Sequence, residues 1–80
     1  MRENSVKELI EYVAKSLVDH PDQVTVTEFR REQFVVIQLR VAPEDMGKVI
    51  GRQGRIAQAM RSLLKVASAR QGMRATLEIA

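Results

Sequence analysis

Apolar residues recur along this chain with two periods, one typical of helices and one typical of strands. In the first segment they repeat every three or four positions and predict a helix over residues 5–18, with an inward face of Val6, Leu9, Ile10, Val13, Ala14, Leu17 and Val18. Ser5 and Glu8 fit a capping box at the start of this helix. Pro21 ends the helix, because proline disfavours a helical conformation in the residue before it.

The second segment alternates between apolar and polar residues and contains many β-branched side chains. This pattern predicts strands over residues 24–29 and 34–41, joined by a short hairpin turn over residues 30–33. The buried face of the second strand is predicted to consist of Val35, Ile37, Leu39 and Val41.

Helical spacing returns in the second half of the chain. Pro43 fits the first turn of a short helix whose apolar side is Met46, Val49 and Ile50. A longer helix is predicted over residues 55–71, with Gly72 as its C-terminal cap and an inward stripe of Ile56, Ala57, Met60, Leu63, Leu64 and Ala67. Alternation over residues 74–79 predicts a third strand.

The order of elements is therefore helix, strand, strand, helix, helix, strand. Eighty residues form one domain, so residues 1–80 are predicted to be a single α+β domain. Its helices are expected to cover one face of a three-stranded sheet, because each amphipathic element must bury its apolar side against another.

The segment between the two later helices carries the clearest chemical signal. Gly51-Arg52-Gln53-Gly54 places two glycines three residues apart, where the absence of a Cβ lets the backbone turn tightly and approach a ligand closely. The next helix begins at the second glycine, so its positive end faces the loop. Lys48, Arg52 and Arg55 add full positive charges. These features predict a binding site for a phosphate backbone.

The charge distribution agrees with this prediction. Residues 1–45 contain six Lys/Arg and nine Asp/Glu, whereas residues 46–80 contain seven Lys/Arg and one acidic residue, Glu78, so balances of −3 and +6 give the net +3. A basic half that begins at the glycine loop is typical of a nucleic-acid surface. Further along, Arg61, Lys65, Arg70 and Arg74 are expected to add salt-sensitive, non-specific attraction.

Several classes of protein are disfavoured by composition. The chain has no cysteine and one histidine, His20, and it contains no nucleophile–base set, which argues against an enzyme, a metal site and a bound cofactor. No apolar run reaches the ~18 residues of a membrane span. The glycine loop matches neither the P-loop nor the dinucleotide-binding pattern.

With Val49 and Ile50 before it, the glycine loop resembles the signature of the KH RNA-binding domain. The order of elements resembles the type II, or prokaryotic, KH fold, which has a mixed sheet. From Val41-Ala42-Pro43 through Gly47 to Ala57, the sequence is most similar to the KhpA (YlqC) family of small, stand-alone bacterial KH proteins. The chain starts just before its first helix and ends on its last strand, so a complete protein of this kind is expected.

The resemblance implies a non-catalytic clamp for single-stranded RNA. Gly51 and Gly54 would give backbone access, and Arg52 and Gln53 would meet phosphates. The remaining candidate RNA-binding residues are Lys48 and Arg55 beside the loop, and Val49, Ile50 and Ala57 in an aliphatic groove for which Ile37 and Leu39 are further candidates. It also implies a cytoplasmic RNA chaperone that acts with a KhpB-type (Jag or EloR) partner in post-transcriptional regulation of cell shape and peptidoglycan homeostasis.

Two other functions remain open at this point. The chain is either a clamp for RNA, a clamp for single-stranded DNA, or a protein-interaction subunit with little RNA contact. Surplus apolar residues on the long helix and just after it indicate either a homodimer or heterodimer interface or a helix that is buried on most of its sides: Ala59, Val66, Ala69 and Met73. The aromatic residues Tyr12, Phe29 and Phe34 lie away from the loop, which argues against base stacking of the kind used by aromatic-lined sheets.

Overall fold

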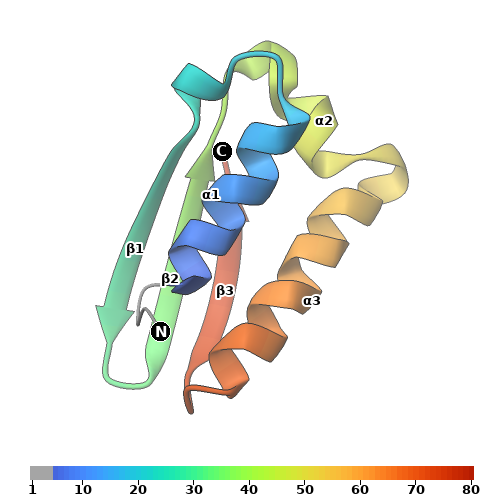
Figure 1. The fold of residues 1–80 in the computed structure, drawn as a ribbon. Coiled ribbons are helices and arrows are strands. Elements are labelled where there is room, and N and C mark those ends of the chain that lie inside the picture. Colours follow the sequence, from blue (N-terminus) through green and yellow to red (C-terminus); the bar gives the residue numbers. More distant parts are fainter. Residues whose placement is uncertain (1–4) are drawn as a thin grey trace.

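The computed structural model describes residues 5–80 and has the predicted order of elements (Figure 1). The helices are α1 (Ser5–Leu17), α2 (Met46–Ile50) and α3 (Arg55–Ala69), and the strands are β1 (Thr25–Arg31), β2 (Phe34–Arg40) and β3 (Arg74–Ile79). Short 3₁₀ turns are found at Pro21–Gln23, Pro43–Asp45 and Arg52–Gly54. The prediction of an α+β fold with the order α-β-β-α-α-β and a mixed sheet, consistent with a type II KH fold, is confirmed.

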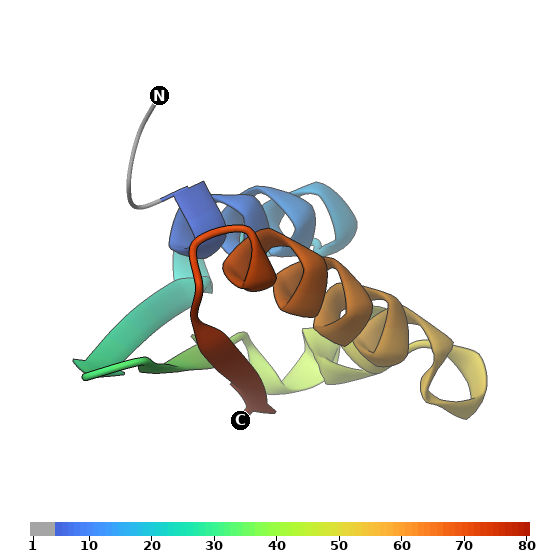
Figure 2. The same ribbon diagram turned by 90° about the horizontal axis from the view of Figure 1, so that it is seen from below.

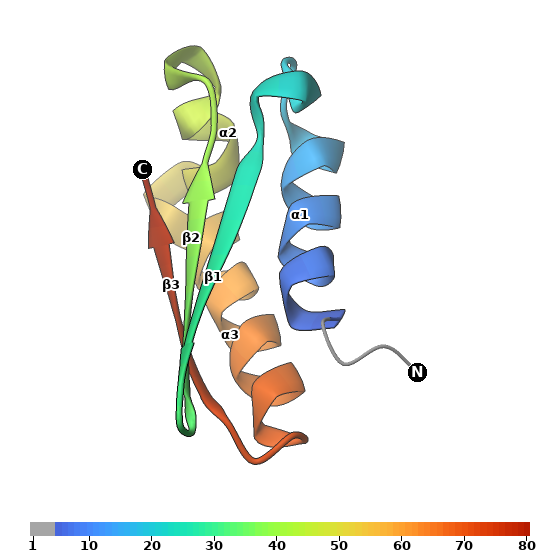
Figure 3. The same ribbon diagram turned by 90° about the vertical axis from the view of Figure 1, so that its left-hand side faces the viewer.

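The molecule has two layers, with the helices on one face of the sheet and the other face open (Figures 2 and 3). The strand order is β1-β2-β3. β1 and β2 pair antiparallel, with Val26 opposite Leu39, and β2 and β3 pair parallel, with Ile37 opposite Leu77. The parallel pair requires a crossover, which α2 and α3 provide on the covered face.

The core lies between the two layers and is built from the predicted inward positions. From the central strand β2, Val35, Ile37 and Leu39 are at most 3% exposed. They pack with side chains of the helices, of β1 and of β3: Val6, Ile10, Ala14, Val26, Val49, Met60, Leu64 and Leu77. Each fully buried aliphatic side chain of this kind contributes ~1.5–3 kcal/mol from burial alone. Among residues 5–80, no helix has the length and apolar character that crossing a bilayer demands.

The boundaries of the hairpin differ from the prediction. β1 extends to Arg31, and only Glu32 and Gln33 form the turn, because Arg30 and Arg31 pair with Val35 and Phe34 despite their charge. Cross-strand hydrogen bonding thus outweighs local composition, as is common at strand ends. Glu32 adopts a φ of 54°, the left-handed conformation that lets two residues reverse the chain.

The helices also end slightly earlier than predicted. α1 ends at Leu17 and α3 at Ala69, and Gly72 closes α3 with a φ of 70° and an N–H that donates to the Ala69 carbonyl. Leu63 was expected to face inward, but it is 48% exposed, because α3 buries only the narrower stripe of Ala57, Met60, Leu64 and Ser68. The Ser5 side chain lies outside the described part of the chain, so the capping box stays a prediction.

Candidate nucleic-acid interface

The glycine loop, Gly51–Gly54, projects from the body of the molecule at the junction of α2 and α3 (Figure 2). Pro43 begins the turn that leads into α2, and α2 ends at Ile50 after five residues. The loop therefore sits between two helix ends, as predicted from the sequence. Figure 1 places it at the opposite end of the molecule from the β1–β2 hairpin.

Gly51 is required by the packing of the loop itself. Its φ of 80° and ψ of 172° belong to a region that only glycine occupies readily. A Cβ at this position would lie 2.6 Å from Cγ1 of Ile56 and 2.9 Å from its backbone nitrogen. The absence of a side chain at Gly51 therefore lets the loop fold back against the first turn of α3.

Gly54 has a different role, because a Cβ there would meet no atom of the chain within 4 Å. Its φ of 74° is left-handed, and Gln53 before it is left-handed too, with a φ of 58°. The N–H of Gly54 donates to the Gly51 carbonyl over 3.1 Å, which closes the turn. The outer surface at Gly54 is thus open to a ligand, and no side chain caps the N-terminus of α3 beside it.

The cationic side chains around the loop differ in their pairing. Arg52 and Arg55 are exposed and form no ion pair with a carboxylate of residues 5–80. Lys48, in contrast, pairs with Asp19 over 3.3 Å between Nζ and Oδ2, although both side chains remain well exposed. The two arginines therefore present positive charge that no carboxylate of the described residues neutralises. The charge of Lys48 is partly neutralised by Asp19, in an exposed ion pair that contributes little free energy and that a ligand can replace.

Burial divides the predicted aliphatic residues of the site into two groups. Val49 and Ala57 are 0% and 3% exposed, and Ile37 and Leu39 are fully buried, so these four side chains belong to the interior of the protein. In this conformation they present no surface for a base to contact. Ile50 is half-buried and is the predicted groove residue that reaches the surface beside the loop.

A buried carboxylate that was not predicted as part of the site fixes the segment leading into α2. Asp45 is 1% exposed, and its two carboxylate oxygens accept hydrogen bonds from the backbone N–H groups of Asp19 (3.2 Å) and His20 (3.0 Å). The sequence places its partners 25 and 26 residues away, so no local pattern reveals the contact. Its neighbour Glu44 faces His20, with 3.7 Å between Oε2 and Nε2.

Sequence comparison places the chain among known proteins. A sequence model described as "KhpA/KhpB, KH domain" matches residues 7–79. The chain belongs to this KhpA/KhpB family of KH domains. The resemblance inferred from the glycine loop and the order of elements is thereby confirmed.

Curated relatives in this family are close and of nearly the same length. The RNA-binding protein KhpA of Clostridium acetobutylicum is 54% identical over 74 residues, which cover 92% of this chain and 99% of the relative. The RNA-binding protein KhpA of Caldanaerobacter subterraneus is 56% identical over 72 residues, covering 90% and 96%. That of Aquifex aeolicus is 50% identical over 76 residues, covering 95% and 96%.

Proposed function

We propose that this chain binds single-stranded RNA without catalysis and that the Gly51–Gly54 loop is the clamp for the phosphate backbone. The observation that carries the proposal is the pair of unneutralised arginines, Arg52 and Arg55, on a loop whose outer backbone surface at Gly54 is open. Membership of a family whose curated relatives are named RNA-binding proteins supports it.

The clamp works through electrostatics and backbone access. A phosphate approaching Gly54 meets the N-terminal end of α3, whose aligned peptide dipoles carry partial positive charge. Arg52 and Arg55 add charged donors, Gln53 adds a neutral amide, and Lys48 joins when phosphate competes with Asp19. Bases then lie beside the half-buried Ile50, next to the buried side chains of Val49 and Ala57 in the adjoining helices. This mode of binding fixes the backbone and reads sequence only weakly.

The chain provides a matched control for testing the clamp. Arg52-Gln53-Gly54 before α3 is repeated as Arg70-Gln71-Gly72 after it, and both Arg-Gln pairs are exposed. The test compares R52D/Q53D with R70D/Q71D by fluorescence anisotropy on a short labelled single-stranded RNA, with circular dichroism to verify folding. Both variants change the net charge equally, so a difference between them reports the position of the charge. R52D/Q53D is expected to lose binding, whereas R70D/Q71D loses only the weak non-specific attraction of Arg70. Equal loss in both, or no loss in either, contradicts the clamp.

Single-stranded DNA shares the phosphate chemistry of RNA, so the same assay includes a competition. Unlabelled RNA and DNA of matched sequence are titrated against the preformed complex. Since contacts to the 2′-OH distinguish the two polymers, RNA is expected to compete at lower concentration. Equal competition would show that the clamp holds either polymer.

A second candidate function, as a protein-interaction subunit, has its own supporting observation. On α3, Leu63 and Val66 are 48% and 60% exposed, and Ala59 and Ala69 are exposed on the same helix. We infer that this stripe binds a second KH domain, as a homodimer or with a KhpB-type partner. A dimer would present two clamps and raise affinity for longer RNA through avidity.

The partner hypothesis is tested with L63D/V66D, which places charge on the stripe without touching the loop. Analytical ultracentrifugation with and without a KhpB-type KH protein is expected to show loss of association while short-RNA binding remains. Retained association would contradict an α3 interface. We extend to this chain the family role of a cytoplasmic RNA chaperone acting on cell shape and peptidoglycan homeostasis, which deletion of its gene in the host tests through cell morphology.

A further inference from the structure

The open face of the sheet carries an exposed aromatic surface that the glycine loop does not use. Side chains on this face form rows across the three strands, given by the register of the sheet: Arg31–Phe34–Arg74, then Phe29–Val36–Thr76, then Thr27–Gln38–Glu78. In the first two rows, Phe34 of β2 and Phe29 of β1 are diagonal neighbours. The backbones of such residues lie about 7–8 Å apart, within reach of aromatic side chains. We call Phe29, Phe34, Val36, Arg31 and Arg74 the phenylalanine surface.

Both aromatic rings of this surface are freely accessible. Phe29 is 55% exposed and Phe34 is 54% exposed, although their strands contribute buried residues to the core on the other face. Together with Arg30, Arg31 and Val36 they line a hollow of about 380 Å³, a size within the range of small-molecule sites. Two solvent-exposed aromatic rings on adjacent strands indicate a binding surface.

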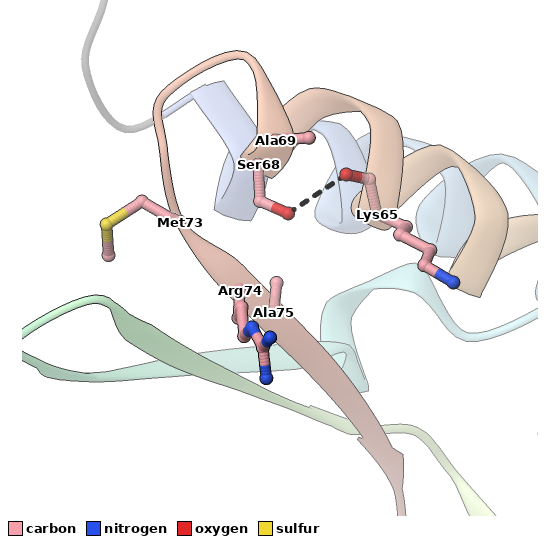
Figure 4. Close-up of a pocket in the computed structure, with 6 residues that line it drawn as sticks. All are labelled: Lys65, Ser68, Ala69, Met73, Arg74 and Ala75. Carbon is pink, nitrogen blue, oxygen red and sulfur yellow. Dashed lines mark hydrogen bonds between the residues drawn. The ribbon is translucent and has the colours of Figure 1, made fainter.

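The charges on this surface are positive and available. Among residues 5–80, neither Arg31 nor Arg74 pairs with a carboxylate. Figure 4 shows Arg74 pointing away from α3 while its neighbour Ala75 points toward that helix. Each arginine stands opposite Phe34 in the register, so Phe34 lies between two arginine residues on the neighbouring strands.

The nearby acidic side chains do not neutralise these two arginines. Glu28 accepts a hydrogen bond from Nε of Arg30 over 2.6 Å. Along β1, Glu28 and Arg30 alternate with Phe29 and Arg31, so they do not belong to the rows of the open face. Glu78 accepts one from the Gln38 amide over 3.2 Å, two rows from Phe34. Glu32 is exposed in the hairpin turn and makes no ion pair among the described residues. The phenylalanine surface itself therefore carries two positive charges and no negative one.

We propose that the phenylalanine surface is a second contact site for single-stranded RNA. Bases stack on Phe29 and Phe34, and phosphates between them meet Arg31 and Arg74. This reverses the expectation from sequence, in which the distance of these aromatic residues from the loop argued against stacking; the register and exposure of the two side chains are the reason. Aromatic rings on adjacent strands of an open sheet, flanked by arginine, are a general means of holding single-stranded nucleic acid, because every base has a face that stacks. The proposal rests on the proposed RNA binding of this chain, but not on the glycine loop being the clamp.

A second copy of the chain fits this surface less well than RNA does. A two-fold contact centred on the Arg31–Phe34–Arg74 row would bring the row near its own copy, so that four arginines without carboxylate partners would gather in one interface. Stable protein interfaces also bury about 800 Å² per partner, whereas three apolar side chains form the centre of this surface. A polyanion matches both the charge and the extent of the surface.

The hairpin end of β1 and β2, which carries Phe34, lies at the opposite end of the molecule from the glycine loop in Figures 1 and 2. RNAs of different lengths can therefore distinguish the two sites. The longest dimension of the protein is 34 Å. At ~3.4 Å per nucleotide in a stacked strand, an RNA of twenty nucleotides spans about 70 Å and reaches both sites. An RNA of five nucleotides, about 17 Å at the same rise, occupies one of them.

The experiment measures anisotropy with five- and twenty-nucleotide RNAs for the native protein, for F29S/F34S and for the control Y12S/L17S. Tyr12 and Leu17 are exposed apolar residues on α1, 73% and 36% accessible, in the helix layer. Leu17 was predicted to face inward, but it is the last residue of α1 and lies at the edge of the covered face. F29S/F34S is expected to weaken binding of the longer RNA at least about fivefold, the lower limit for stacked bases. The control is expected to leave it unchanged, and circular dichroism verifies that all three proteins fold.

Ultraviolet crosslinking to uridine-containing RNA gives a readout that does not depend on affinity. Trypsin cleavage after Arg31 and Arg40 releases residues 32–40, which contain Phe34. Crosslinks on this peptide are expected with the longer RNA, and they should persist when R52D/Q53D disables the loop. Failure of the clamp therefore leaves this result intact.

Two results would overturn the proposal. One is equal affinity of the native protein and F29S/F34S for the longer RNA, with no crosslink on residues 32–40. The other is a change of oligomeric state in F29S/F34S by ultracentrifugation with unchanged RNA affinity, which would assign the surface to a protein contact.

Discussion

Gly51 and Ile56 are packed so closely that a side chain at Gly51 would overlap the first turn of α3, with a Cβ only 2.6 Å from Cγ1 of Ile56. This contact fixes the angle at which the chain leaves α2 and enters α3. The shape of the glycine loop is thus determined by packing inside the protein, before any ligand binds. Gly54, whose Cβ would meet nothing, leaves its outer side for a ligand.

Replacing each of the two glycines by alanine is therefore expected to lower the stability of the protein by a different amount. G51A combines overlap with Ile56 and a backbone conformation unfavourable to any side chain, so it should lower the free energy of unfolding by about 3 kcal/mol. G54A carries only the cost of a left-handed backbone, about 1 kcal/mol. Urea denaturation followed by circular dichroism measures both. Equal losses would show that the Ile56 contact does not constrain the loop.

G54A should affect the RNA affinity of the protein more than it affects the stability of the fold. Its methyl group would stand on the open side of the loop, where the phosphate backbone is proposed to lie, so binding should fall about tenfold while the protein stays folded. G72A, at the left-handed glycine after α3, has a similar backbone cost and is the control. Anisotropy with a short RNA separates the two, and similar affinities would place the RNA elsewhere.

Asp45 connects the segment before α2 to the end of α1, and we expect its charge to be needed for stability. D45N keeps the shape but presents an amide group to one of the two backbone N–H donors, which leaves that donor unsatisfied in a buried site. The free energy of unfolding should fall by about 1–3 kcal/mol. E44Q, at the exposed neighbour, should change it by less than about 0.5 kcal/mol. Thermal and urea denaturation of the two variants compare them directly.

The salt dependence of RNA affinity reports how many cationic side chains at the loop neutralise phosphates. If Arg52 and Arg55 each neutralise one phosphate, the logarithm of affinity should fall against the logarithm of salt concentration with a slope of about −1.4 for short RNA. D19N frees Lys48 from its partner and should steepen this slope by about 0.7. R52Q should reduce it by the same amount. A native slope of about −1.4 that D19N leaves unchanged would mean that Lys48 does not reach the RNA, whereas a native slope of about −2.1 would mean that phosphate already displaces Asp19.

Much of the fold was predictable because its signals are local. The two-residue alternation of Val35, Ile37 and Leu39 identified the central strand, and the three-to-four spacing of Met60 and Leu64 identified the long helix. The errors occur where pairing or packing with distant residues decides. Arg30 and Arg31 are in β1 because of their partners in β2, and Leu63 is exposed because α3 contacts the sheet along a narrow stripe.

The candidate site divides in the same way. The glycine spacing and the positive charges of Arg52 and Arg55 were visible in sequence, because they lie in one short segment. The Asp45 contacts and the Lys48–Asp19 pair join residues more than twenty-four positions apart and become visible only in the folded chain. Likewise, the register that sets Phe34 between Arg31 and Arg74 depends on two strand pairings, which no local pattern specifies.

The most direct measurement of the central claim is an amide chemical-shift titration of ¹⁵N-labelled protein with a five-nucleotide single-stranded RNA. The chain has four glycines, and the second Arg-Gln-Gly at Arg70–Gly72 is an internal reference for the first at Arg52–Gly54. The clamp predicts the largest shifts at Gly51, Gly54 and the first turn of α3, with little change at Gly72. Shifts of equal size at Gly54 and Gly72, or none at the loop, would contradict it.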